Sequence, residues 1–251
     1  EAIPLIASSI MSKKIAEGTS ALVLDVKTGS GAFMSDPKKA SELARTMVQL
    51  GVDAGVKMRA LVTAMDVPLG LTAGNALEVR ESVEVLAGGG PADVVELTIL
   101  LAREMIDAAG IVGKDPADAL RDGSAMDHWK RMISAQGGDP NAQLPIASEK
   151  HVILATESGT MTKMDAMKIG VSAWRLGAGR SKQGEKVQAG AGIEMHAKPG
   201  DYISKGSLLL TLHTDESARF ERAIEILDGA IEIKENGKVE RLPLVIERIT
   251  E

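Results

Sequence analysis

The sequence contains no cysteine, which excludes disulfide bonds and thiolate metal sites. Aromatic residues are almost as scarce, with 2 Trp, 1 Tyr and 2 Phe among 251 residues, and no run of basic residues is present. Together with a formal net charge of -6, this scarcity argues against a nucleic-acid surface built on stacked aromatic rings. The most apolar run, Leu97–Ala102, is far too short to cross a bilayer. We therefore expect a cytoplasmic protein that binds neither nucleic acid nor membrane.

The first third of the chain has the pattern of an α/β protein. Pro4 and Gly18 favour the start and the end of one helix over residues 4–17. The apolar run ALVLDVK (21–27) predicts a strand, a Gly-Ser-Gly loop follows it, and Asp36-Pro37 begins a second helix. A further strand is predicted over 56–63. The order β-α-β makes a parallel sheet the economical topology, and ligands collect at the carboxyl ends of parallel strands.

Two polar residues interrupt the apolar face of the first helix. Ser9 and Lys13 are one turn apart, so they lie on the same side of the helix, between Leu5 and Ile6. One interpretation is structural: Ser9 bonds back to a carbonyl one turn earlier, and Lys13 extends along the apolar surface to water. The other interpretation is that both side chains face a ligand.

Several longer motifs carry a resemblance. The stretch IPLIASSIMSKKIAEGTSALVLDVKTGSGAFM, followed in order by LVTAMDVPLGLTAGNALEVRE, LGAGR and KPGDYISKGSLLLTLH, closely resembles the thymidine phosphorylase and pyrimidine-nucleoside phosphorylase family. The resemblance covers nearly the whole chain. It implies reversible phosphorolysis, in which a pyrimidine nucleoside and phosphate give the free base and a pentose 1-phosphate. It also implies that Ser9 and Lys13 bind the pyrimidine ring, with Lys13 as the catalytic cation, and that the enzyme works as a homodimer.

The chemistry agrees with this implied assignment. Breaking a glycosidic bond leaves negative charge on the base, so a positioned cation stabilises the transition state more than the ground state. Two alternatives stay open: a non-catalytic fragment that binds a base or a partner, and a related phosphorylase acting on nucleoside 5′-monophosphates.

The resemblance also implies inorganic phosphate as co-substrate, no organic cofactor, and a bound monovalent cation such as potassium. The ligands of this cation here would be the backbone carbonyls of Leu69 and Thr72 and the carboxylate of Glu81, all hard oxygen donors. The alternative is a loop that closes onto a helix capped by Asn75, with Glu81 as an exposed helical carboxylate.

Parts of the family pattern have no counterpart in this sequence. The Lys-x-Ser-Thr-Gly-Gly phosphate-binding region is absent, and none of the four histidines (His128, His151, His196 and His213) matches the position of the family's catalytic histidine. The chain therefore resembles the carboxyl-terminal part of an enzyme, and we expect it to turn over slowly or not at all by itself.

Beyond residue 145 short strands separated by glycine turns predict a β module, which in the family resembles biotinyl carrier domains. Lys163 leads directly into an expected helix cap at Asp165 rather than forming a hairpin tip, so no prosthetic group is expected on it. The predicted fold class is α/β, with a remnant of an all-helical lobe, a mostly parallel mixed sheet with flanking helices, and this β module. The predicted boundaries are 1–19 for the helix of the base-binding lobe, 20–145 for the α/β domain and 146–251 for the carboxyl-terminal α+β module.

Overall fold

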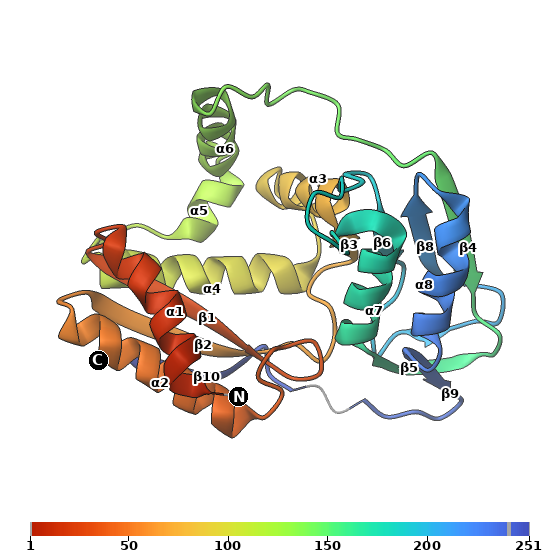
Figure 1. The fold of residues 1–251 in the computed structure, drawn as a ribbon, viewed down its shortest axis with the longest axis horizontal. Coiled ribbons are helices and arrows are strands. Elements are labelled where there is room, and N and C mark those ends of the chain that lie inside the picture. The colour runs from red at the N-terminus through yellow and green to blue at the C-terminus, as the bar shows by residue number, and fades with distance from the viewer. Residues whose placement is uncertain (1, 240–241, 251) are drawn as a thin grey trace. The chain divides into compact units, whose positions relative to one another are not determined.

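The computed structural model describes residues 2–239 and 242–250, which form two compact units (Figure 1). The first unit comprises residues 2–65, 95–119 and 242–250, and the second comprises residues 66–94 and 120–239. The units alternate along the chain, whereas the segments predicted from the sequence are contiguous. The predicted domain boundaries stay a prediction.

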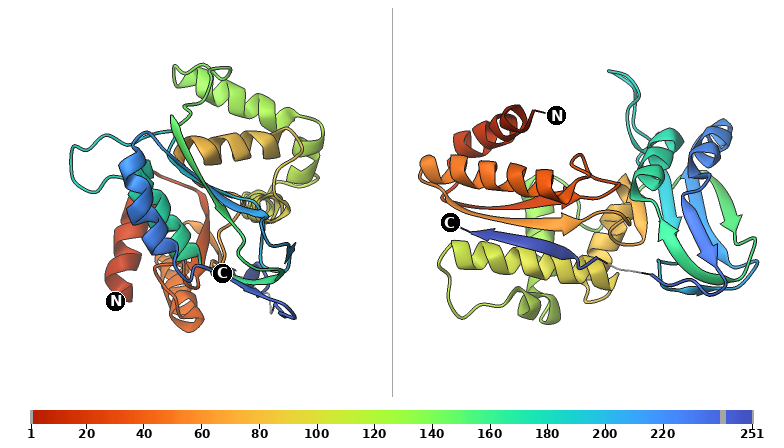
Figure 2. Two further views of the ribbon diagram at one scale, coloured as in Figure 1. Left: turned by 90° about the vertical axis from the view of Figure 1, so that its right-hand side faces the viewer. Right: turned by 90° about the horizontal axis from the view of Figure 1, so that it is seen from below.

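The first unit is built on a three-stranded sheet in the order β1-β2-β10. Its elements are α1 (Ile3–Ala16), β1 (Ala21–Thr28), α2 (Pro37–Asp53), β2 (Lys57–Ala64), most of α4 (Ala92–Ala108) and β10 (Val245–Thr250). Helices α1 and α2 lie on one side of the sheet and α4 lies on the other (Figure 2). The bounds of α1, β1 and β2 and the start of α2 were predicted to within one or two residues, because each has its own local signals.

Those local signals are visible in the backbone. The Asp36 side chain accepts a hydrogen bond from the Lys38 N–H at 2.9 Å and so caps α2. Gly18 ends α1 with φ of 71°, a conformation that glycine adopts without a steric penalty. The core beneath α1 and α2 is rich in methionine, with Met11 and Met58 each 1% exposed.

The prediction of a mostly parallel sheet is wrong. β1 and β2 pair in parallel, from Ala21 opposite Lys57 to Thr28 opposite Ala64. β10 pairs with β2 in the antiparallel direction. Among the described residues, all the strand pairs of the second unit are antiparallel as well. A parallel pair requires a crossover connection such as α2, whereas β10 joins the edge of β2 from the distant end of the chain.

The second unit contains two antiparallel sheets with the strand orders β3-β6-β8-β4 and β7-β5-β9. Its strands are β3 (Thr72–Gly74), β4 (Glu149–Leu154), β5 (Gly159–Met164), β6 (Gly192–Met195), β7 (Tyr202–Ile203), β8 (Leu208–Thr214) and β9 (Ile231–Lys234). Its helices are α3 (Asn75–Leu86), α6 (Ser124–Ala135), α7 (Ala166–Ala173), the π-helical turn η1 (Trp174–Ala178), the short η2 (Ser217–Arg219) and α8 (Phe220–Leu227), while α5 (Pro116–Arg121) lies at a unit boundary. α7 and α8 pack against each other, and the Asp165 carboxylate caps α7 as the sequence predicted.

Within the described residues, no helix is both long enough and apolar enough to cross a membrane.

Candidate functional site

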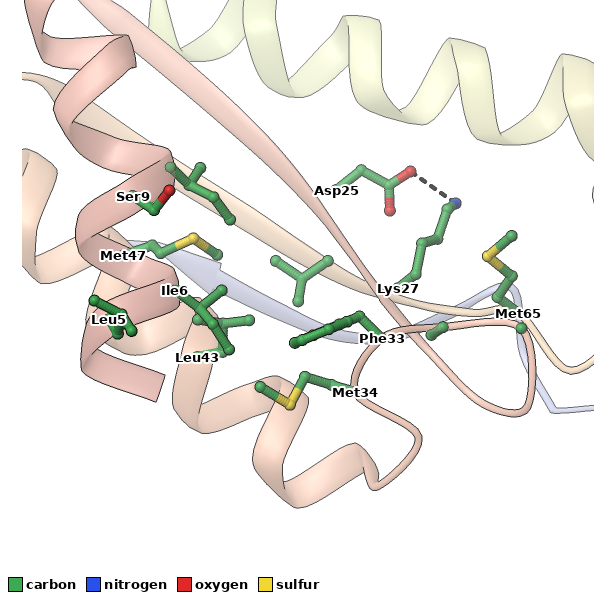
Figure 3. A pocket seen from close by; sticks show the side chains of 14 residues that line it. Leu5, Ile6, Ser9, Asp25, Lys27, Phe33, Met34, Leu43, Met47 and Met65 are labelled. Atoms are coloured by element: carbon green, nitrogen blue, oxygen red, sulfur yellow. Dashed lines mark ion pairs between the residues drawn. The ribbon is translucent and has the colours of Figure 1, made fainter. Parts of the chain in front are cut away.

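A cavity of about 660 Å³ lies in the first unit, between α1 and the carboxyl end of β1 (Figure 3). Most of its wall is apolar and comes from α1, α2 and the loop after β1. Phe33, on that loop, keeps 69% of its surface exposed although its neighbour Met34 is buried at 2%. Ser9, Asp25 and Lys27 are the polar side chains in this wall. A mostly apolar cavity with a few convergent polar groups is the usual form of a small-molecule site.

The sequence-predicted pair on α1 is only partly brought to this cavity. Ser9 lines the cavity, and its hydroxyl has no hydrogen-bond partner within the described part of the chain. The back-bonding interpretation of Ser9 is therefore wrong. Lys13 lies one turn further along the helix, is exposed, and is not part of the cavity wall. The buried face of α1 is made instead by Ala7 and Met11.

The cavity lining does contain one lysine, Lys27 on β1. Its Nζ lies 2.7 Å from Asp25 Oδ2, and the other carboxylate oxygen of Asp25 accepts a hydrogen bond from Thr63 Oγ1 at 2.5 Å. Asp25 and Lys27 are two residues apart, so a strand directs both to the same face, and Thr63 is the β2 residue opposite Lys27. Thr63 is fully buried, so it holds the carboxylate, which in turn orients the ammonium.

Sequence reasoning missed Asp25 and Lys27, although a signal was present. Both are charged residues at alternate positions of an otherwise apolar strand, next to its carboxyl end. A charged pair at that place has no packing role, since the neighbouring positions Leu24 and Val26 already supply the core contacts.

The sequence-predicted cation ligands lie in the second unit, around the loop between β2 and β3. The Leu71 N–H donates to Glu81 Oε1 at 2.7 Å, and a Cβ on Gly70 would lie 2.0 Å from Glu81 Oε2. Glu81 is only 8% exposed, so the expectation of an exposed helical carboxylate is wrong. Asn75 does not cap α3 either: its side-chain amide donates to the Ala178 carbonyl at 2.8 Å.

The state of the Glu81 carboxylate follows from its surroundings. Burial raises the pKa of Glu81, the hydrogen bond from the Leu71 N–H and the neighbouring Thr72 hydroxyl lower it, Asp93 raises it and Lys198 lowers it; the net direction is upward. The Thr72 hydroxyl oxygen itself is buried and makes no hydrogen bond within the described residues.

These residues fit a monovalent cation. The Leu69 carbonyl and Glu81 Oε2 accept no hydrogen bond within the described residues, and the Thr72 hydroxyl oxygen is buried without a partner. A cation at this place would bind oxygens that accept no hydrogen bond from the protein, and its charge would offset the free-energy cost of burying the Glu81 carboxylate. Among the described residues no group of three or more His, Cys, Asp or Glu side chains could hold a metal ion, so carbonyl oxygens would have to contribute.

A second ionic cluster, built around the buried His213, lies on the sheet of the same unit. His213 Nε2 lies 2.6 Å from Glu194 Oε2, and Arg80 pairs with the other oxygen of Glu194. Burial lowers the pKa of His213 and outweighs the opposing effect of Glu194, with Lys150 and Arg80 lowering it further. Burial alone would raise the pKa of Glu194, but His213 and Arg80 together lower it.

This cluster makes the stability of the protein fall on acidification. Both groups have a lower pKa in the folded than in the unfolded protein, so their contribution is present at neutral pH and is lost as the pH falls, first below the ordinary value of 6.5 for His213 and then below 4.5 for Glu194. We expect the free energy of unfolding in urea to decrease between pH 7 and pH 5.5, with a slope of at most about 1.4 kcal/mol per pH unit for this proton. His213→Gln should flatten that slope, and His128→Gln, on the exposed surface of α6, should not. An unchanged slope in His213→Gln would contradict this account of the cluster.

Comparison with known proteins defines first the class and then the family. A glycosyl transferase family model, describing the a/b domain, matches residues 2–126, which include the β1-α2-β2 unit and the cavity. A model of the pyrimidine nucleoside phosphorylase C-terminal domain matches residues 160–234. The chain is therefore an α/β protein of glycosyl transferase type, extended by a second characteristic domain.

Individual relatives make this assignment narrower. The chain is 57% identical over 249 residues to a thymidine phosphorylase of Mycobacterium tuberculosis. This alignment covers 99% of this chain and 58% of the relative. It is 40% identical over 258 residues to a pyrimidine-nucleoside phosphorylase of Staphylococcus epidermidis (98% of this chain, 59% of the relative) and 38% identical over 251 residues to one of Bacillus subtilis (96% and 58%). The chain belongs to the thymidine phosphorylase and pyrimidine-nucleoside phosphorylase family, and it spans just under three fifths of the length of these relatives.

Proposed function

We propose that this chain is part of a pyrimidine nucleoside phosphorylase, an enzyme that transfers the pentose of thymidine, uridine or deoxyuridine to inorganic phosphate. The products are the free base and ribose or deoxyribose 1-phosphate. The observation that carries the proposal is 57% identity over 99% of the chain to a protein named thymidine phosphorylase. The Ser9 cavity supports it, since it offers a polar contact within an apolar wall of a size suited to a pyrimidine ring.

In this proposal the helix α1 recognises the base. The Ser9 hydroxyl both donates and accepts, so it can bond to a ring carbonyl or to a ring N–H. As the glycosidic C–N bond breaks, its electron pair stays on the base, and the sugar carbon bonds to a phosphate oxygen. The Lys13 ammonium stabilises the negative charge that develops on the ring oxygens.

The Lys27 ammonium, paired with Asp25 at 2.7 Å, gives the cavity lining a positioned cation. Among the described residues the Lys27 ammonium pairs with Asp25, which uses one of its three N–H donors, so it keeps donors for an oxygen of the nucleoside or of phosphate. The carboxylate and Thr63 fix where that ammonium lies, which is what a preorganised site requires. We therefore add Lys27 to Ser9 and Lys13 as a substrate contact.

The remaining parts of the proposal concern partners and cofactors. The enzyme uses phosphate as co-substrate, uses no organic cofactor, and works as a homodimer in the cytoplasm. Leu69, Thr72 and Glu81 provide oxygens for potassium or another monovalent cation, whose charge supports the loop around Glu81. The β module keeps the arrangement of a biotinyl carrier domain, and its two small antiparallel sheets support that interpretation.

The test is base release in the presence of phosphate, measured with this polypeptide and with a version extended upstream. Thymidine, uridine and a pyrimidine nucleoside 5′-monophosphate serve as parallel substrates. We expect phosphate-dependent release of thymine or uracil from the nucleosides by the extended version. Release from the monophosphate alone would favour the related nucleotide phosphorylase, and no release from any substrate would favour a non-catalytic binding module.

A further inference from the structure

Lys198 reaches from one part of the second unit into the loop that carries the proposed cation ligands. It follows β6, in a turn closed by a hydrogen bond from its own N–H to Asp201 Oδ2 at 2.8 Å. Its ammonium donates to the Pro68 carbonyl and lies 3.1 Å from Asp93 Oδ2. The Lys198 side chain is only 20% exposed, so this contact is partly withdrawn from solvent.

The same loop is fixed by a second carboxylate. Asp93, in the first turn of α4, shares Oδ2 between the Lys198 ammonium and the Gly70 N–H, which lies 3.2 Å away. On the other side, Glu81 accepts from the Leu71 N–H with Oε1 only. The loop backbone between Pro68 and Leu71 is therefore held between two carboxylates.

The charges around this loop do not balance. Asp93 and Glu81 contribute two negative charges, and they are close enough for Asp93 to raise the pKa of Glu81. Lys198 is the cation whose charge acts on Glu81, and its direct ion pair is with Asp93. Among the described residues Glu81 has no direct ion pair, and the Leu69 carbonyl of the same loop and the buried Thr72 hydroxyl accept no hydrogen bond.

We propose that Lys198 sets the charge selectivity of this loop: by neutralising Asp93 it leaves a single negative charge, which suits a monovalent cation and disfavours a divalent one. Without the ammonium, the Pro68–Leu71 loop would carry two uncompensated carboxylates, Asp93 and Glu81, together with the freed Pro68 carbonyl, and carboxylate and carbonyl oxygens are the ligands that Ca²⁺ takes. Lys198 is thus a specificity-determining residue for the cation rather than a ligand. The inference rests on the proposed cation ligands and is independent of phosphorolysis.

The test replaces Lys198 with methionine and measures thermal unfolding in CaCl2 and in KCl at equal ionic strength. Wild type is expected to unfold at a higher temperature in KCl than in CaCl2, because its loop binds the monovalent cation in preference to the divalent one. Lys198→Met is expected to unfold at least about 3 °C higher in CaCl2 than in KCl, a shift typical of a modest binding free energy in a protein of this size. Lys198→Gln keeps a donor for the Pro68 carbonyl and gives the same readout with less disturbance of the fold.

Two further variants separate charge from general effects. In Asp93→Asn/Lys198→Met the loop again has one negative charge, so the preference for CaCl2 should disappear. Lys205→Met removes an exposed lysine of the same unit and should behave as wild type. The proposal is overturned if Lys198→Met and Lys198→Gln show no preference for CaCl2, if the double variant keeps that preference, or if wild type already has it. None of these outcomes depends on whether the protein cleaves nucleosides.

Discussion

Replacing Lys13 with alanine is expected to lower the kcat for phosphorolysis of thymidine by about 10²–10³-fold, the usual loss when one preorganised donor to a developing anion is removed. The ammonium is required most when the glycosidic bond is breaking, so kcat should fall more than the affinity for thymidine. The measurement is steady-state release of thymine at saturating phosphate, in the version extended upstream.

Lys14→Ala is the matched control for this prediction. Lys14 is the next residue of the same helix, about 100° further around it, and its ammonium pairs with Glu17 at 3.2 Å. We expect its kcat to stay within about twofold of wild type, because an exposed pair of this kind contributes little. Near-native turnover by Lys13→Ala would remove Lys13 from the proposed mechanism.

Replacing Gly70 with alanine is expected to destabilise the protein by about 3 kcal/mol. Gly70 has φ of 70°, which an L residue adopts at a cost of about 1–2 kcal/mol. In addition, the new Cβ would lie 2.0 Å from Glu81 Oε2 and 2.9 Å from Val94 Cγ2, so the buried carboxylate or the loop must move, at about 1–3 kcal/mol. The measurement is the free energy of unfolding in urea.

Gly206→Ala measures the backbone part of this effect alone, so the difference between the two variants is the steric part. Gly206 lies in the same unit and has φ of 85°, but a Cβ there would meet nothing within 4 Å. We expect about 1 kcal/mol of destabilisation, from the backbone conformation alone. If both variants lost the same free energy, the close approach of Glu81 to the loop would be contradicted.

The parts of the fold that sequence predicted well are those with local signals. The helix after Asp36 and the strand over 21–27 have a cap, a period and a breaker of their own. β10 has none of these: it is a short strand at a sheet edge, and only its distant partner β2 defines it. That nonlocal pairing is why the sheet was expected to be mostly parallel.

The candidate site shows the same division between local and nonlocal information. Glu81 was expected to be exposed because charged residues surround it in sequence. Its true position follows from the helical period instead, since Leu77, Glu81 and Val85 are four residues apart and form one buried stripe of α3. Lys198 was beyond prediction, because its contact with Asp93 joins residues 105 positions apart.

The central claim is that the cavity beside Ser9 binds the pyrimidine. The most direct measurement is a titration of this ¹⁵N-labelled polypeptide with thymidine, followed by amide chemical shifts. We predict saturable shifts at Ser9, Lys27 and Gly31, which line the cavity, and loss of these shifts in Ser9→Ala. Saturable shifts confined to the second unit, or none at all at millimolar thymidine, would contradict the claim.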